Sequence, residues 1–146
     1  MASDFHFLEH VALADAAFEA VGDSPSDLFT AAARAVIETM VNPVTVGSVW
    51  KRDMGRDDPE LPGLLFDWLS DLVFLKDAEG VMFSDISVSV TEDRAMRVWR
   101  LHGTLIGEPL DQDRQELRSD VKAVTKHLYK VWQEDNHWKA RVVLDI

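Results

Sequence analysis

The segment His137–Ile146 reads HWKARVVLDI and is the last stretch of the sequence. Alternation through Trp138, Ala140 and Val142 is typical of a β-strand with one buried face, and Val143-Leu144 lengthens the apolar run. Chain ends exposed to water usually fray, so a terminus this apolar indicates burial. We therefore predict that the segment is the closing strand of a sheet and stays ordered to its last residue.

Two acidic groups stand side by side at this end of the chain, the Asp145 side chain and the α-carboxylate of Ile146. Carboxylate oxygens are the ligands that Ca²⁺ and Mg²⁺ prefer, so one further carboxylate would give a compact cation site. Asp15 is the candidate, because it lies at the edge of an apolar segment and directly precedes a predicted strand. Three unpaired carboxylates repel one another unless a cation joins them. The site requires the strand after Asp15 to lie beside the closing strand; otherwise Asp145 is a strand end that faces water.

Length and composition predict one folded domain, residues 1–146. Hydrophobic residues make up 47% of the chain, with five Trp and seven Phe, which is enough for a normal core. The absence of cysteine excludes disulfides and favours a reducing, cytoplasmic location. The first ten residues lack the pattern of a secretory signal, and no apolar run is long enough to span a membrane. A net charge of −11 disfavours strong direct nucleic-acid binding and suits a cation or a basic protein partner better.

Hydrophobic periodicity predicts two helices among short strands, an α+β domain with two main helices packed on a mostly antiparallel sheet. The first helix follows Ser24, a favourable N-cap, carries an apolar stripe to Met40 and ends at Asn42-Pro43. The second starts near Pro59 and Pro62 and ends at Gly80. Strands are predicted at Phe5–His10, Ala16–Val21, Val44–Trp50, Ile86–Thr91, Ala95–Ile106, Val121–Trp132 and His137–Ile146. Between them we predict a polar loop at Lys51–Asp58, a tight turn at Glu92-Asp93 and a long charged connection at Gly107–Asp120.

Several kinds of catalytic site have no support in the sequence. The seven glycines are scattered and form no phosphate-binding loop, and neither a nucleophile elbow nor a cysteine is present. The five histidines show no paired metal-ligand spacing. The carboxylates remain, and they leave open a metal-dependent hydrolase, in which bound metal activates water, and a protein-interaction module without metal.

Segments spread along the chain resemble the archease family. They are Glu9-His10 followed by Asp15, GDSPSDLF at 22–29, FDWLSDL at 66–72, DAEG at 77–80, EPLD at 108–111, VKAVTKH at 121–127 and LDI at 144–146. Their order and spacing make the combination specific, and together they cover nearly the whole chain. The sequence departs from the family pattern in having Val11–Ala14 before Asp15, two residues longer than usual, Ala17 where Gly is usual, Gln115 where His is frequent and Lys126 where Tyr is frequent.

The resemblance implies a small, non-enzymatic α+β protein that activates the GTP-dependent, RtcB-type RNA ligase of tRNA splicing and RNA repair. Such proteins promote guanylylation of the ligase and allow it multiple turnovers. The resemblance also implies a divalent cation, Ca²⁺ or Mg²⁺, held by Asp15, Asp145 and the carboxylate of Ile146. Glu116 and Lys122 are further candidates for the surface that meets the ligase, although both also suit ordinary charged positions in a loop and a strand.

Overall fold

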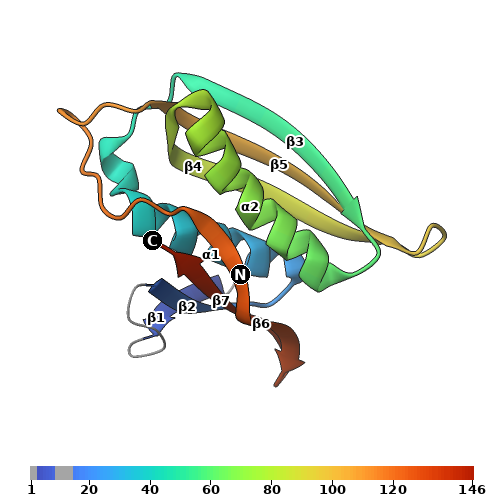
Figure 1. Cartoon of the computed structure of the whole chain (residues 1–146). Coiled ribbons are helices and arrows are strands. Elements are labelled where there is room, and N and C mark those ends of the chain that lie inside the picture. The colour runs from blue at the N-terminus through green and yellow to red at the C-terminus, as the bar shows by residue number, and fades with distance from the viewer. Residues whose placement is uncertain (1–2, 9–14) are drawn as a thin grey trace.

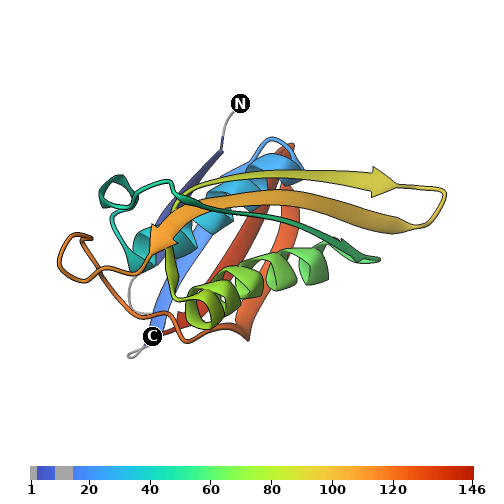
Figure 2. The ribbon, with the colours of Figure 1, turned by 90° about the horizontal axis from the view of Figure 1, so that it is seen from above.

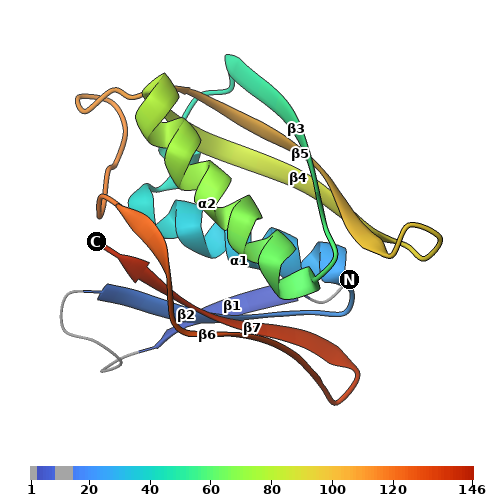
Figure 3. The same cartoon turned by 45° about the vertical axis from the view of Figure 1, so that its right-hand side comes forward.

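A computed structural model of the protein describes residues 3–8 and 15–146. Within these residues two helices lie between two antiparallel sheets (Figures 1 and 3). The helices are α1 (Pro25–Met40) and α2 (Leu61–Glu79), with a short 3-10 turn η1 (Pro43–Thr45). The strands are β1 (Ser3–Leu8), β2 (Asp15–Gly22), β3 (Trp50–Asp58), β4 (Val81–Asp93), β5 (Val98–Pro109), β6 (Ala123–Glu134) and β7 (His137–Asp145). The predicted α+β class, with two main helices on antiparallel strands, is confirmed.

One sheet has the strand order β1-β2-β7-β6 and the other has β3-β5-β4. Figure 2 shows the helices between the two layers. The four-stranded sheet brings β2, near the start of the chain, beside β7 at its end, and β7 lies in the interior of this sheet between β2 and β6. This arrangement positions the candidate site.

Local signals place both helices where the sequence predicts them. The Ser24 hydroxyl accepts a hydrogen bond from the Asp27 backbone N–H at 3.1 Å, and Pro25 occupies the first turn of α1. Gly80 ends α2 in the left-handed conformation, with φ of 63°. The two helices therefore begin and end for reasons readable in a few neighbouring residues.

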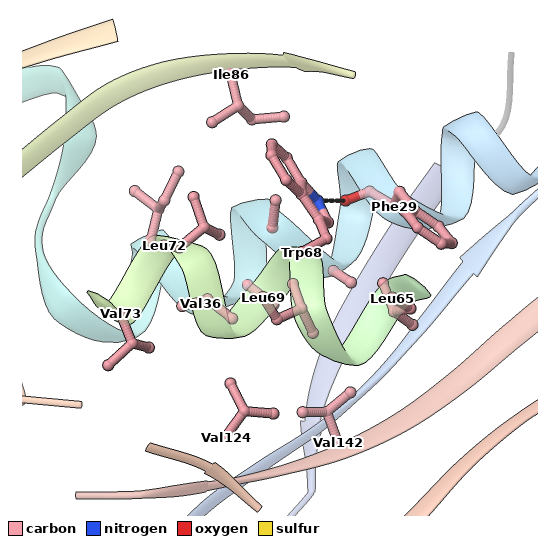
Figure 4. Packing of buried hydrophobic residues seen from close by; sticks show 14 of the residues in the cluster. Phe29, Val36, Leu65, Trp68, Leu69, Leu72, Val73, Ile86, Val124 and Val142 are labelled. Atoms are coloured by element: carbon pink, nitrogen blue, oxygen red, sulfur yellow. Dashed lines mark hydrogen bonds between the residues drawn. The ribbon is translucent and has the colours of Figure 1, made fainter. Parts of the chain in front are cut away.

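Trp68 of α2 fills the centre of the core between the helices and the sheets (Figure 4). Its ring is completely buried, and its indole N–H donates to the Phe29 carbonyl of α1 at 3.2 Å. On β5, a side chain at Gly103 would approach the Trp68 ring to 2.8 Å, so glycine makes room for the ring there. From the four-stranded sheet, Val124 and Val142 pack against the same cluster.

The segment 44–58 differs from the prediction of a strand at Val44–Trp50 followed by a loop at Lys51–Asp58. The Asn42 side chain caps η1 by accepting from the Val44 N–H at 3.2 Å, so the chain turns here and leaves Val44 and Val49 exposed. The predicted loop is instead β3, an edge strand paired with β5.

The segment of β3 was predicted as a loop because many of its residues are charged. The Arg56 guanidinium contacts both carboxylate oxygens of Asp71 on α2, and Arg52 binds Glu79 at 3.0 Å. A strand at a sheet edge can carry such side chains because they reach past the apolar layer to partners on the neighbouring helix.

Other boundaries move by a few residues. The β4–β5 turn lies at residues 94–97 and not at Glu92-Asp93, because β4 stays paired up to Asp93 opposite Val98. Strand β5 continues to Pro109, which shortens the predicted charged connection, and β6 begins at Ala123. Glu9, His10 and the segment Val11–Ala14 lie outside the described residues.

Candidate metal site at the end of the β2–β7 pair

Asp15 and Asp145 are direct partners across two neighbouring antiparallel strands. Asp15 is the first residue of β2, Asp145 is the last residue of β7, and the strand register sets them opposite each other. Directly opposed residues in such a pair have Cα atoms about 4.5–5.5 Å apart, with their side chains on the same face. The juxtaposition that the sequence analysis required is therefore present in the fold.

The two carboxylates lie on the face of the sheet turned away from the helices. The neighbouring pair Ala16–Leu144 and the pair Phe18–Val142 face the core, where Phe18, Val142 and Leu144 are fully buried. Because side chains alternate along a strand, Asp15 and Asp145 point to the opposite side. Both residues are half-buried.

The end of β7 is held on several sides, which keeps the Asp145 backbone in place. On one side β2 pairs with it, and on the other Ala123 of β6 is its register partner. The Lys122 backbone N–H donates to the Asp145 carbonyl oxygen at 2.7 Å. The Ile146 side chain, directly after Asp145, is half-buried and packs against the hydrophobic core.

The electrostatics of this corner favour a cation. Two carboxylates opposite each other in a sheet repel. Among residues 3–8 and 15–146, no lysine, arginine or histidine forms an ion pair with either Asp15 or Asp145. The same residues contain no cluster of three His, Asp or Glu side chains that could hold a metal, so Asp15 and Asp145 form a pair of carboxylates there and not a complete set of side-chain ligands. An all-oxygen donor set of this kind matches Ca²⁺ or Mg²⁺.

The two further candidates occupy different surroundings. Lys122 has an exposed side chain and lies next to the site through its backbone bond to Asp145. Glu116 belongs to the loop between β5 and β6, where its N–H donates to the Thr45 hydroxyl at 2.9 Å and its carbonyl accepts from the Asn42 N–H. Its contacts tie the loop to η1 and not to β7.

A buried carboxylate that the sequence analysis did not single out lies at the end of β5. Glu108 accepts hydrogen bonds from Arg114 at 2.9 Å and from the Gln115 side chain at 2.9 Å. The Arg114 guanidinium, the Gln115 amide and the Gly47 backbone N–H lower the pKa of Glu108 to about 2. This cluster folds the loop after β5 onto the protein. In the sequence Glu108 appears as the first residue of the EPLD segment at 108–111, within the predicted charged connection, and nothing there indicates that its side chain is buried.

Three departures from the family pattern have defined places in the structure. Gln115 is buried and also accepts from the Asp111 N–H at 3.0 Å, so it serves as a structural link in the loop. The Lys126 ammonium lies 3.8 Å from the centre of the Phe66 ring on α2, a cation–π contact. Ala17 is buried in β2 opposite Val143.

Comparison with known proteins agrees with this fold. The model of the Archease protein family (MTH1598/TM1083) matches residues 5–146. The chain belongs to the archease family. Among named archeases, that of Methanopyrus kandleri is 36% identical over 139 residues, covering 95% of this chain and 96% of its own. The archease of Methanothermobacter thermautotrophicus is 37% identical, with 91% and 93% covered.

Two solved structures have the same fold as this member of the archease family. The solution structure of protein 1598 from Methanobacterium thermoautotrophicum superposes with a TM-score of 0.81 at 33% identity, covering 97% of this chain and 98% of that one. The crystal structure from Thermotoga maritima, described as an archease and possible chaperone, has a TM-score of 0.61 at 20% identity, with 91% of each chain covered. In the described part of the present chain, no helix is long and apolar enough to cross a membrane.

Proposed function

We propose that this protein is a non-enzymatic activator of a GTP-dependent, RtcB-type RNA ligase and that it holds a divalent cation through Asp15, Asp145 and the α-carboxylate of Ile146. The observation that carries the metal site is the register pairing of Asp15 with Asp145. Membership of the archease family supports the partner, through the activity that the resemblance implies. The proposed location is the cytoplasm, in line with the absence of cysteine from the sequence.

The proposed mechanism uses the carboxylate corner, by which we mean Asp15, Asp145 and the α-carboxylate of Ile146 at the end of the β2–β7 pair. Asp15, Asp145 and the α-carboxylate of Ile146 would hold a divalent cation, which would supply positive charge opposite the GTP phosphates while the ligase is guanylylated. Asp15 and Asp145 would supply oxygens on the face of the sheet turned away from the helices, where both residues are half-buried. The exposed Lys122 side chain next to the corner provides a positive charge for contact with the ligase.

Calorimetric titration of Ca²⁺ and Mg²⁺ tests the metal site. Asp145→Asn keeps the size of the side chain and removes its charge, so we expect the affinity to fall about tenfold or more, since ligand charge sets the affinity of such sites. Asp135→Asn is the matched control: it makes the same change in the β6–β7 turn, at the other end of β7. Affinity that is equal in wild type and Asp145→Asn would contradict the site.

A guanylylation assay tests the activity. Ligase and GTP are mixed with and without the protein, and we expect wild type but not Asp145→Asn to accelerate formation of the guanylylated ligase and repeated RNA joining. The absence of stimulation by the wild-type protein rules out the activator role. Phosphate release from GTP by the protein alone would instead indicate a metal-dependent hydrolase, and ligase binding without any metal dependence would indicate an interaction module.

A further inference from the structure

A buried lysine is linked to the candidate site through the hydrogen bonds of a single peptide group. Lys76, in the last turn of α2, has only 8% of its side chain exposed. Its ammonium contacts three oxygens, those of Asp120 Oδ1 at 2.6 Å, Asp77 Oδ1 at 2.9 Å and the Val121 carbonyl at 2.9 Å. An ammonium has three donors, so all of them are used.

The protonated form of Lys76 is favoured in this setting. Burial by itself lowers the pKa of the Lys76 ammonium, but the hydrogen bonds that it donates to Asp120 and Asp77 outweigh burial, and the net pKa is raised. A charged group kept in so enclosed a position imposes a fixed geometry on its neighbours, because leaving any of its donors unpaired is costly.

One peptide group connects this lysine to the candidate site. The carbonyl oxygen of the Val121–Lys122 peptide accepts from Lys76, and the N–H of the same peptide donates to the Asp145 carbonyl at 2.7 Å. A peptide group is planar and rigid, so fixing its oxygen fixes the direction of its N–H. Hydrogen bonds in series also polarise and strengthen one another. The Val121 side chain is fully buried, which prevents the segment from shifting sideways.

Figure 3 shows the chain that leads into β6 passing the end of α2 and arriving beside the C-terminus. We propose that Lys76 is a positioning residue for the cation site: through the Val121–Lys122 peptide it holds the backbone of Asp145, and thereby the two last carboxylates, in the geometry that binds metal. This inference rests on the proposed function and names the residue that orders its site.

The direction in which cation affinity changes when Lys76 loses its charge distinguishes positioning from a simple electrostatic effect. Removing the Lys76 charge makes the protein more negative, and by Coulomb attraction alone a cation would then bind more tightly. Positioning predicts the reverse, because Asp145 loses the support of its backbone. Loss of a group behind a metal ligand typically lowers metal affinity by about 10–100-fold.

The experiment measures Ca²⁺ affinity by calorimetry, with exchange of the Lys122 amide hydrogen followed by NMR in the metal-free protein. Lys76→Met retains an unbranched stem without the ammonium; we expect about tenfold weaker binding and faster Lys122 exchange. Lys76→Arg keeps the charge, and the cavity beside it, lined by Met40, Met82 and Leu117, leaves room for the larger head group. We expect Lys76→Arg to bind within about twofold of wild type, because its guanidinium has N–H donors for the Val121 carbonyl.

Lys139→Met is the matched control. It removes the same charge from β7, where Lys139 pairs with Glu134 at 2.7 Å, and we expect its Ca²⁺ affinity to equal or slightly exceed that of wild type. Thermal unfolding of each variant confirms that affinities are compared between folded proteins. If Lys76→Met does not fold, Lys76→Gln takes its place, since its amide is too short to reach the Val121 carbonyl, and the same loss is expected.

The outcomes distinguish this inference from the function on which it rests. Affinity in Lys76→Met that equals or exceeds that of wild type, while Asp145→Asn still weakens binding about tenfold or more, overturns the role of Lys76 and leaves the metal site intact. Wild-type protein that binds neither Ca²⁺ nor Mg²⁺ overturns both. A fall in affinity that is as large in Lys139→Met as in Lys76→Met also overturns the inference, because the loss would then not depend on the contact of Lys76 with the Val121–Lys122 peptide.

Discussion

At the scale of the residue, the protein uses its few buried charged groups to fix loops. Glu108 anchors the loop after β5 through Arg114 and Gln115, and Lys76 anchors the segment before β6 through Asp120 and Val121. From the sequence, Glu108 stood out only as part of the EPLD segment at 108–111 and Lys76 did not stand out, because a single acid or lysine carries no functional pattern of its own. Their partners lie in loops whose conformation has no periodic signal.

Replacing Glu108 with Gln should flatten the acid dependence of stability. The pKa of this carboxyl is lowered from 4.5 to about 2 in the folded protein, so its ionised form contributes stability above about pH 4.5, which is lost as the pH falls toward 2. Urea unfolding at a series of pH values should show a shallower decline between these limits in Glu108→Gln than in wild type, and a lower stability at pH 7.

The substitution Arg114→Met is a second test of how the Glu108 cluster makes the stability of the protein depend on pH. Since Arg114 is the largest cause of the lowered Glu108 pKa, its removal should make the acid-induced loss of stability begin at a higher pH. An acid dependence of the wild-type protein that neither substitution alters would show that Glu108 does not carry it.

At the scale of the element, sequence patterns were most informative where neighbours decide the structure. Both helices have their caps and stops within a few residues of their ends, and the sequence placed them well. Strand β3 was missed because its arginines find their acids on α2, at residues 71 and 79, which a local pattern cannot reveal. The segment Val44–Trp50 alternates like a strand but is turned by Asn42-Pro43.

Gly80→Ala should lower the free energy of unfolding by about 1 kcal/mol, since an L-residue is strained in the left-handed conformation that Gly80 adopts at φ of 63°. An added methyl group meets no atom within 4 Å, so the cost is conformational and not steric. Gly80→Asn should cost less, because Asn tolerates this conformation better. Urea unfolding measures all three proteins.

The control for this prediction is Gly55→Ala in β3. An added methyl group there lies at an ordinary 3.5 Å from the Leu101 carbonyl oxygen, and the backbone is not left-handed. We expect no loss of stability, because alanine has less conformational freedom to lose than glycine. A Gly80→Ala protein as stable as wild type would be inconsistent with this explanation of how α2 ends.

At the scale of the whole molecule, the candidate site depends on pairing the two ends of the described chain. The apolar tail and the isolated Asp15 suggested the meeting from sequence, and the family resemblance named the residues. The register itself, Asp15 opposite Asp145, could not be read from either strand alone, because it depends on how β2 and β7 pack in the same sheet.

Under the proposed function, Ca²⁺ or Mg²⁺ should raise the melting temperature of the wild-type protein. The carboxylates come together only when β2 and β7 are paired, so a cation binds the folded form and stabilises it by about 2.7 kcal/mol at a free concentration 100 times the dissociation constant. Asp15→Asn and Asp145→Asn should each lose most of this shift in differential scanning calorimetry. A shift of equal size in wild type and both variants would place the cation elsewhere.

The position of β2 between β1 and β7 also governs the order of events during synthesis. When β1 and β2 leave the ribosome, the partner on the far edge of β2 has not yet been made, and Phe18 has no complete sheet around it. The strands of the β3-β5-β4 sheet are all translated earlier than β7, so this sheet can pair before β7 has been made. The pairing of Asp15 with Asp145 is accordingly among the last features of the fold to assemble, and a nascent or truncated chain without β7 lacks the proposed metal site.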